Sequence, residues 1–212
     1  MNHGKEFDRI YRIKSDSQGR ILKFLLILSS LLVIHAAANV AIAAPVHIIA
    51  FGDSGVYGKG VVRDETYPAQ LQKMLRQKGY DVTVTNDGVN GLTSGDAVAN
   101  VGRVGKADVV IVQVGVNDAK QGVPPGTIRQ NVGAVIDKLK ANGARVLVVS
   151  HPSADVCDVA SSKGAPCVIW GGLPDTQYHV PGDPQNHFNA TGLHVMALRM
   201  LPALEKLLGA KH

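Results

Sequence analysis

A serine on the turn after a short, largely apolar stretch is the residue of this chain best placed for nucleophilic chemistry. The run Val46–Phe51 is rich in β-branched residues and ends at Gly52-Asp53-Ser54. In α/β proteins the turns that follow strands lie at the carboxyl edge of the sheet, where ligands bind. A hydroxyl there becomes a nucleophile when a base and an anion-stabilising site lie beside it. Taken alone, the tripeptide is also ordinary turn chemistry, and Ser54 could simply cap a following helix.

Three further motifs carry polar groups at the ends of predicted elements. Gly91 lies in a polar segment after the second predicted strand, and the pair Asn117-Asp118 follows the third. Asp183 and His187 stand in the segment before the last predicted helix. A histidine can supply the base, and an amide or a close backbone N–H can stabilise an oxyanion. Because parallel strands end at the same edge of a sheet, we expect these groups to lie near the serine.

Alternating strand and helix patterns indicate the elements that must position these groups. Strand-like runs, whose apolar centres fit strands buried on both faces, are Val46–Phe51, Val82–Asn86, Val109–Val114, Arg145–Ser150 and, more weakly, Cys167–Trp170. Amphipathic helical patterns lie at Tyr67–Lys78, Thr127–Ala141 and Ala190–Leu208. This alternation predicts an α/β fold, a three-layer α/β/α sandwich with a central parallel sheet of about five strands. The segment Pro152–Gln185 is rich in Gly and Pro and is predicted to be largely irregular.

The first 44 residues differ in composition from the rest. Six basic residues precede the apolar run Phe24–Ile34, and small residues follow from Ala36 to Ala44. This is the layout of a secretory signal peptide, with cleavage expected near Ala43 or Ala44. The apolar run is short for a membrane span, but the basic segment is long, so an uncleaved anchor is the alternative. We therefore predict residues 1–44 as a signal peptide or N-terminal anchor, residues 45–212 as one domain, and a periplasmic or secreted location.

The charge balance gives no sign of a nucleic-acid partner. The whole chain has a net charge of +5, whereas the part after residue 43 carries 16 basic and 14 acidic residues. No basic patch with interleaved aromatic residues is visible in it. Membrane contact is expected only through the leader, if the leader stays attached.

Cys157 and Cys167 are the only cysteines. In an exported protein such a pair favours a disulfide over a metal site. His151 and His179 are the nearest further ligands, but their spacing matches no common zinc pattern. We expect a disulfide and no metal.

The order and spacing of the four motifs resemble those of the SGNH hydrolases, the GDSL esterases and lipases. The resemblance runs from about Val46 to Leu208 and is greatest to the bacterial periplasmic thioesterase, lysophospholipase and arylesterase group. It includes Tyr67-Pro68-Ala-Gln-Leu after the first motif and Ala-Asn-Gly-Ala-Arg-Val-Leu-Val-Val ending at Val149. It implies a flavodoxin-like sandwich and a cofactor-free serine hydrolase, which cleaves small acyl esters or thioesters through an acyl-enzyme intermediate.

The resemblance also implies a role for each motif. Ser54 would be the nucleophile and His187, whose following Phe-Asn-Ala-Thr-Gly resembles the family's His-Pro-Asn-x-x-Gly, its base. The Ser54 and Gly91 backbone N–H groups and the Asn117 amide would form the oxyanion hole. Without a Cβ, Gly91 lets its backbone approach a substrate. The simpler alternatives are a turn glycine at 91 and an ordinary strand-to-helix turn at Asn117-Asp118.

Two positions depart from the family pattern. The orienting aspartate usually stands three residues before the histidine, where this chain has Pro184. We predict that Asp183 takes this role, with Asp175 or a backbone carbonyl as the alternatives. In the first motif Gly55 stands where the family commonly has leucine, which is expected to loosen the wall beside the nucleophile.

Two other functions fit the same fold. One is a carbohydrate O-acetylesterase, in which Trp170 and Tyr178 would stack on sugar rings. The other is a non-catalytic binding module that lost its activity through the altered acid position. The sequence leaves acyl length, leaving group and oligomeric state open.

Overall fold

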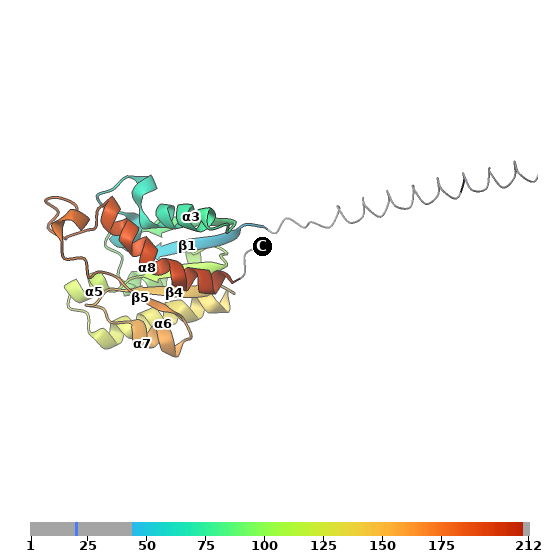
Figure 1. The fold of residues 1–212 in the computed structure, drawn as a ribbon. Helices are drawn as coiled ribbons and strands as arrows, with labels where there is room; N and C mark the ends of the chain where they lie inside the picture. Colours follow the sequence, from blue (N-terminus) through green and yellow to red (C-terminus); the bar gives the residue numbers. More distant parts are fainter. Residues whose placement is uncertain (1–19, 21–43, 210–212) are drawn as a thin grey trace, which may run out of the picture. The chain divides into compact units, whose positions relative to one another are not determined.

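The computed structural model describes residue 20 and residues 44–209, of which the latter belong to one compact unit (Figure 1). The predicted leader, residues 1–44, lies outside the described residues apart from Arg20 and Ala44, and so remains a prediction. Among residue 20 and residues 44–209, no helix combines the length and the hydropathy of a membrane span.

The centre of the unit is a five-stranded parallel sheet with strand order β2-β1-β3-β4-β5. The strands are β1 (Val46–Gly52), β2 (Val82–Gly88), β3 (Val109–Gln113), β4 (Arg145–Ser150) and β5 (Cys167–Ile169). All five predicted strands are therefore confirmed, with ends that differ by at most two residues. Gly52 pairs with both Gly88 and Gln113, so β1, β2 and β3 end at the same level of the sheet. This shared edge brings the sequence motifs together.

Helices cover both faces of the sheet, as the predicted sandwich requires. One face carries α3 (Tyr67–Gln77) and α8 (Ala190–Leu208), and the other carries α4 (Ser94–Asn100), α6 (Pro125–Ala141) and α7 (Cys157–Ser162) (Figure 1). Two short helices, α2 (Ser54–Tyr57) and α5 (Val116–Lys120), follow β1 and β3 directly. The three-layer prediction is confirmed.

Alternate residues of each central strand enter opposite cores, because successive side chains of a strand point to opposite faces. In β1, Ile48 and Ala50 pack beneath α3 and α8, whereas Ile49 and Phe51 pack beneath α6. Both sets are buried, with exposed fractions of at most 5%. This double burial explains why the strands appear in the sequence as apolar runs with little alternation.

The segment Pro152–Gln185 contains short regular elements within a largely irregular chain. It holds α7, β5 and a 3-10 turn, η3 (Thr176–Tyr178). Most of the segment is irregular, as predicted, and β5 was expected; α7 and η3 were missed, because elements of three to six residues are too short to show a hydrophobic period. Helix α4, which has seven residues, was missed for the same reason.

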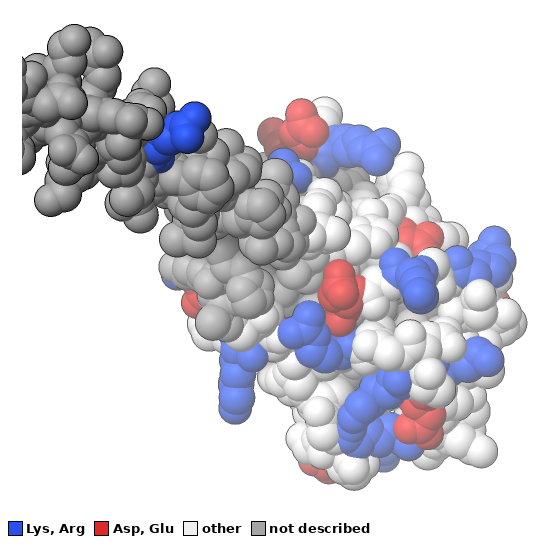
Figure 2. Space-filling model, turned by 90° about the vertical axis from the view of Figure 1, so that its right-hand side faces the viewer, with Lys and Arg blue, Asp and Glu red and all other residues white. Residues whose placement is uncertain are grey.

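Basic and acidic side chains are interspersed on the face shown in Figure 2. Among the described residues, surface ion pairs include Lys78–Glu205, at 2.9 Å, and Arg129–Asp155, at 3.1 Å. Exposed pairs of this kind stabilise a protein by only about 0–1 kcal/mol each, so the fold depends mainly on its apolar cores.

Candidate active site

Ser54 lies at the first position of α2, on the turn that leaves β1. Asp53 caps this helix, since its Oδ1 accepts a hydrogen bond of 2.9 Å from the Gly55 backbone N–H. The Asp53 backbone N–H donates to the Gln113 carbonyl, at 3.1 Å, and so fastens the turn to the end of β3. Asp53 therefore orders its own turn, and these contacts hold the serine hydroxyl at the carboxyl edge.

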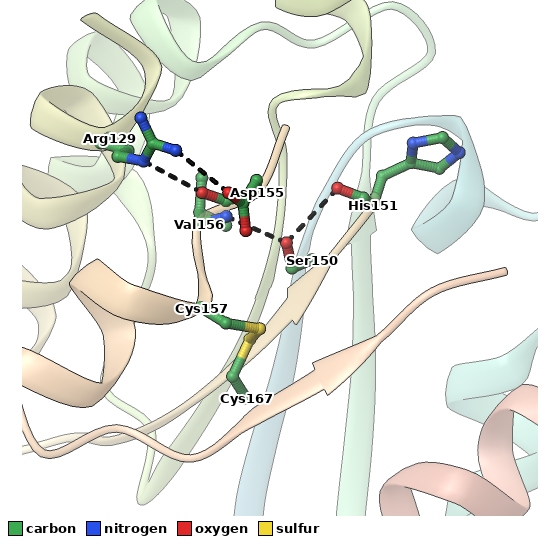
Figure 3. The surroundings of a disulfide bond; sticks show 7 residues. All are labelled: Arg129, Ser150, His151, Asp155, Val156, Cys157 and Cys167. Carbon is green, nitrogen blue, oxygen red and sulfur yellow. Dashed lines mark hydrogen bonds and ion pairs between the residues drawn. A yellow bond between two sulfur atoms is a disulfide. The ribbon is translucent and has the colours of Figure 1, made fainter. Parts of the chain in front are cut away.

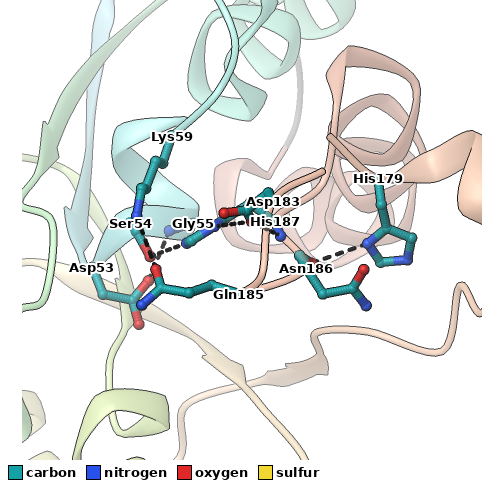
Figure 4. Close-up of polar contacts among 9 residues, drawn as sticks. All are labelled: Asp53, Ser54, Gly55, Lys59, His179, Asp183, Gln185, Asn186 and His187. Carbon is teal, nitrogen blue, oxygen red and sulfur yellow. Dashed lines mark hydrogen bonds and ion pairs between the residues drawn. The ribbon is translucent and has the colours of Figure 1, made fainter. Parts of the chain in front are cut away.

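Ser54, His187 and Asp183 form one hydrogen-bonded chain (Figure 4). The Ser54 Oγ lies 2.9 Å from His187 Nε2, and His187 Nδ1 lies 2.6 Å from Asp183 Oδ2. The side chains of His187 and Asp183 are 12% and 14% exposed, so bulk water screens this chain poorly. The His187 backbone N–H and, after it, the imidazole lower the pKa of Asp183 below its usual value. Asp183 is therefore an anion at neutral pH, facing the ring.

The loop before α8 absorbs the extra residue between the aspartate and the histidine. The Asn186 backbone N–H donates to the Asp183 carbonyl, at 3.1 Å, and Asn186 adopts a left-handed φ of 57°. Asparagine tolerates this conformation better than most residues. The turn brings the Asp183 carboxylate back to His187, whereas the Asp175 carboxylate faces Gln177. Of the two predicted acids, the structure brings only Asp183 to the histidine.

The loop after β2 places Gly91 close to the serine turn. The Val89 backbone N–H donates to the Gly52 carbonyl, at 2.8 Å, which joins this loop to the end of β1. Gly91 has a φ of 81°, and a Cβ there would meet no atom within 4 Å. Its backbone is thus exposed, in a conformation that favours glycine.

Asn117, in the first turn of α5, is anchored to the same loop. Its Nδ2 donates to the Leu92 carbonyl, at 2.9 Å, which uses one of the two amide hydrogens. The other hydrogen forms no hydrogen bond among the described residues. Asn117 and Gly91 are therefore held on adjoining segments.

Asp118 has a structural role that the sequence analysis did not assign to it. This buried carboxylate accepts hydrogen bonds from the Ser94 backbone N–H, at 2.7 Å, and from the Ser94 hydroxyl, at 2.6 Å. It therefore ties α5 to the start of α4 and holds the Asn117 loop against the Gly91 loop. The adjacent Thr93-x-x-Asp96 capping box was the only sequence signal for this helix start.

The wall beside the nucleophile is closed rather than loose. A Cβ on Gly55 would lie 2.2 Å from Nε2 of Gln113 and 3.2 Å from a ring carbon of Trp170. Those two side chains fill the space that a larger residue at position 55 would take. The expectation that Gly55 loosens this wall is therefore wrong, because residues distant in sequence supply the missing volume.

The pKa of Asp53 is shifted in the folded protein. Burial raises the pKa of this carboxyl to about 6, although the hydrogen bond from Gly55 acts in the opposite direction. Its Oδ2, the Gln113 Oε1 and the Tyr67 hydroxyl are buried without a hydrogen-bond partner in the part of the chain that the structure describes.

A cavity of about 760 Å³ opens beside Ser54 and His187. Its apolar wall is formed by Trp170, Leu173, Pro174, Phe188 and Leu193. Trp170 packs against Phe188 at a centroid distance of 5.4 Å and against Tyr67 at 5.7 Å. Lys120 and His151 also line the cavity, and burial and, after it, the charge of Lys120 lower the pKa of His151.

The disulfide Cys157–Cys167 confirms the predicted pairing (Figure 3). It joins the start of α7 to β5, the short edge strand that leads into the apolar wall at Trp170. Nearby, the Val156 backbone N–H donates to the Ser150 hydroxyl, at 3.1 Å, and Arg129 pairs with Asp155 (Figure 3). Residue 20 and residues 44–209 contain no group of three or more His, Cys, Asp or Glu side chains suited to a metal ion.

A sequence model of the GDSL-like lipase/acylhydrolase family matches residues 50–195, which span all four motifs. The chain belongs to this family. This membership confirms the predicted resemblance, and the fold agrees with it.

Individual relatives of this GDSL-family chain carry esterase names. An arylesterase from Vibrio mimicus is 30% identical over 121 residues, which cover 56% of this chain and 60% of that protein. Esterase TesA from Pseudomonas aeruginosa is 32% identical over 110 residues, which cover 50% and 55%. The chain thus spans little more than half the length of these relatives. The crystal structure of TesA has a TM-score of 0.66 and 24% identity, and the match covers 76% of this chain and 99% of that one, which shows the shared fold.

Proposed function

We propose that this chain is a serine esterase that hydrolyses carboxylic esters or thioesters through an acyl-enzyme intermediate. The observation that carries the proposal is the hydrogen-bonded chain from Ser54 Oγ through His187 to Asp183, with contacts of 2.9 and 2.6 Å. Membership of the GDSL-like lipase/acylhydrolase family supports the reaction class. Nucleophile, base and oxyanion donors are all protein groups, so the chemistry requires no cofactor.

In the proposed mechanism His187 first accepts a proton from Ser54 and then donates it to the leaving group. Its Nε2 takes the hydroxyl proton as the Ser54 Oγ attacks the substrate carbonyl carbon. The resulting imidazolium is stabilised by the Asp183 carboxylate, which accepts from Nδ1. Nε2 then protonates the leaving alcohol or thiol as the tetrahedral intermediate collapses to the acyl-enzyme. In the second half-reaction His187 takes a proton from a water molecule, which attacks the acyl carbonyl carbon. The proton then returns to Ser54 Oγ as the carboxylic acid is released.

The oxyanion formed in each half-reaction would be held by three donors. These are the Ser54 backbone N–H at the start of α2, the Gly91 backbone N–H and the free hydrogen of the Asn117 amide. One donor of this kind lowers the barrier by about 3–4 kcal/mol. Asp118 would act indirectly, by keeping α5 and the Gly91 loop in contact.

The cavity indicates the substrate class. Its aromatic and aliphatic wall favours an apolar acyl or aryl group beside the reacting carbonyl. The relatives named arylesterase and esterase TesA support this class. The predicted leader would place the enzyme in the periplasm or outside the cell.

The direct test is hydrolysis of p-nitrophenyl acetate and butyrate by the wild type and Ser54→Ala, with fluorophosphonate labelling alongside. We expect kcat to fall by about four to six orders of magnitude in the variant, and one label per wild-type chain at Ser54. Equal turnover by both proteins would exclude the serine mechanism. A folded protein with neither turnover nor label would instead favour the non-catalytic binding module.

The same site could serve a carbohydrate O-acetylesterase, and the structure offers that function less support. The Trp170 ring packs against Tyr67 and Phe188, and Tyr178 is not among the residues that line the cavity. Acetate release from acetylated xylan, without turnover of longer acyl esters, would reverse this preference.

A further inference from the structure

His179 lies outside the Ser54–His187–Asp183 chain but is joined to the loop that carries it. The side chain is buried, with 9% of the residue exposed, and its ring packs on Phe188 at a centroid distance of 4.8 Å. His179 also forms a β-bridge with Phe188, next to the catalytic histidine.

Both ring nitrogens of His179 contact backbone carbonyl oxygens. Nδ1 lies 3.0 Å from the Asn186 oxygen, a contact drawn in Figure 4, and Nε2 lies 2.7 Å from the Leu173 oxygen. Carbonyl oxygens only accept, whereas a neutral imidazole has a single N–H to donate. A neutral ring would therefore leave one nitrogen lone pair against a carbonyl oxygen in a partly buried contact, which costs free energy. Only the doubly protonated ring satisfies both contacts.

The two carbonyls belong to the two segments that border the site. Asn186 is the residue with a left-handed φ that precedes His187, and Leu173 belongs to the apolar wall of the cavity. We propose that His179, as an imidazolium, is a positioning residue that clamps the catalytic-histidine loop to the cavity wall through these two hydrogen bonds. The kinetic part of this inference rests on the proposed function.

Ionisable groups on the neighbouring segments set the electrostatic surroundings of the clamp. They are Asp175 before η3 and Tyr178 at its end, Asp183, His187 and Lys59 at the catalytic loop, and His194 and Arg199 on α8. Asp175 faces Gln177, and Asp183 is bonded to His187. No carboxylate of the described residues forms an ion pair with His179, so its partners are the two neutral carbonyls.

The protonation state can be measured without any enzymatic activity. Long-range ¹H–¹⁵N spectra of the full chain, labelled with ¹⁵N-histidine and recorded near neutral pH, report both ring nitrogens of each histidine. His179→Phe assigns the signal. We expect both nitrogens of His179 to be protonated. A neutral ring would overturn the proposal, and this result stands even if the chain hydrolyses no ester.

The positioning role is tested by the kinetics of His179→Phe, which keeps an aromatic ring against Phe188 but removes both donors. We expect kcat/KM for p-nitrophenyl butyrate to fall about 10- to 100-fold, mainly through kcat. We also expect the pH profile of kcat/KM to differ between the wild type and the variant, because only the wild type carries the two ring donors.

His194→Phe is the matched control, because His194 is an exposed histidine on α8 whose ring contacts Gln70 instead. It should keep the wild-type rate and pH profile. His179→Gln can donate to one of the two carbonyls, so its kcat should lie between those of the wild type and His179→Phe. It is used in place of His179→Phe if that variant does not fold. Wild-type kcat and pH profile in both His179 variants would refute the clamp.

Discussion

One oxygen of Asp183 accepts two hydrogen bonds from His187, 2.7 Å from the backbone nitrogen and 2.6 Å from Nδ1. The backbone contact fixes where the histidine lies, and the ring contact fixes how its imidazole is turned. Nε2 is consequently directed at the Ser54 hydroxyl, 2.9 Å away. The four-residue spacing between acid and base therefore does not prevent the geometry that a serine hydrolase needs.

Removing the charge of Asp183 should disable the base while leaving the nucleophile in place. We expect Asp183→Asn to lower kcat for p-nitrophenyl butyrate by about 10³- to 10⁴-fold, because the amide favours the wrong tautomer of His187. Asp175→Asn is the matched control and should keep its activity, since that carboxylate faces Gln177. A larger loss of kcat in Asp175→Asn than in Asp183→Asn would show that Asp175 orients His187 instead.

Asn117→Ala should remove one oxyanion donor. We expect kcat to fall by about 10²- to 10³-fold with little change in KM, because the amide acts on charge that develops only after attack. Asn142→Ala, at the exposed end of α6, should leave both constants unchanged. A loss confined to KM would show that Asn117 binds the ground state instead.

The contact between position 55 and Gln113 can be measured by a double-mutant cycle. Gly55→Ala should lower the free energy of unfolding by about 1–3 kcal/mol, because its Cβ would approach Nε2 of Gln113 to 2.2 Å. In a Gln113→Ala background the same substitution should cost less, with a coupling of about 0.5–3 kcal/mol in urea unfolding. Additive costs would mean that Gln113 does not fill this space.

Asp53→Asn should change how stability depends on pH. The pKa of Asp53 is about 6 in the folded protein, against an ordinary value of 3.8 for an aspartate, so ionisation favours the unfolded chain. The resulting destabilisation is absent below about pH 4 and complete above about pH 6, where it reaches about 3 kcal/mol. The asparagine keeps the Oδ1 acceptor for Gly55 and cannot ionise.

Urea unfolding of both proteins at pH 4.5 and 7.5 provides the measurement. The stability of Asp53→Asn relative to the wild type should increase between the two values. Comparing the variant with the wild type cancels the titration of the other carboxylates. A difference that does not depend on pH would show that Asp53 titrates normally.

Loss of the disulfide should loosen the segment that forms the cavity wall. We expect Cys157→Ser combined with Cys167→Ser to lower the free energy of unfolding by about 2–3 kcal/mol, since the bridge closes a loop between residues ten apart. KM for apolar esters should rise, because β5 leads into Trp170. Reducing agent should lower the stability of the wild type but not that of the double variant. An unchanged KM would show that the disulfide does not hold the apolar wall of the cavity in place.

Much of the architecture could be predicted from the sequence because its signals are local. A strand buried on both faces appears as an apolar run, as in β1, β3 and β4, and the length of α6 and α8 makes their periodicity visible. The short elements α4 and α7 give no such signal, and their positions depend on capping, packing and the disulfide.

By itself, the sequence determined the sheet, the disulfide pair, and the motifs that meet at the edge carrying Ser54, because residue order places groups that follow parallel strands on one side. Only the tertiary structure decided which groups contact each other there. The left-handed turn at Asn186 brings Asp183 to His187, and Gln113 fills the space beside Gly55. The two carbonyls on His179 come from separate segments. These contacts depend on how loops pack against one another, and no local pattern of residue types encodes that packing.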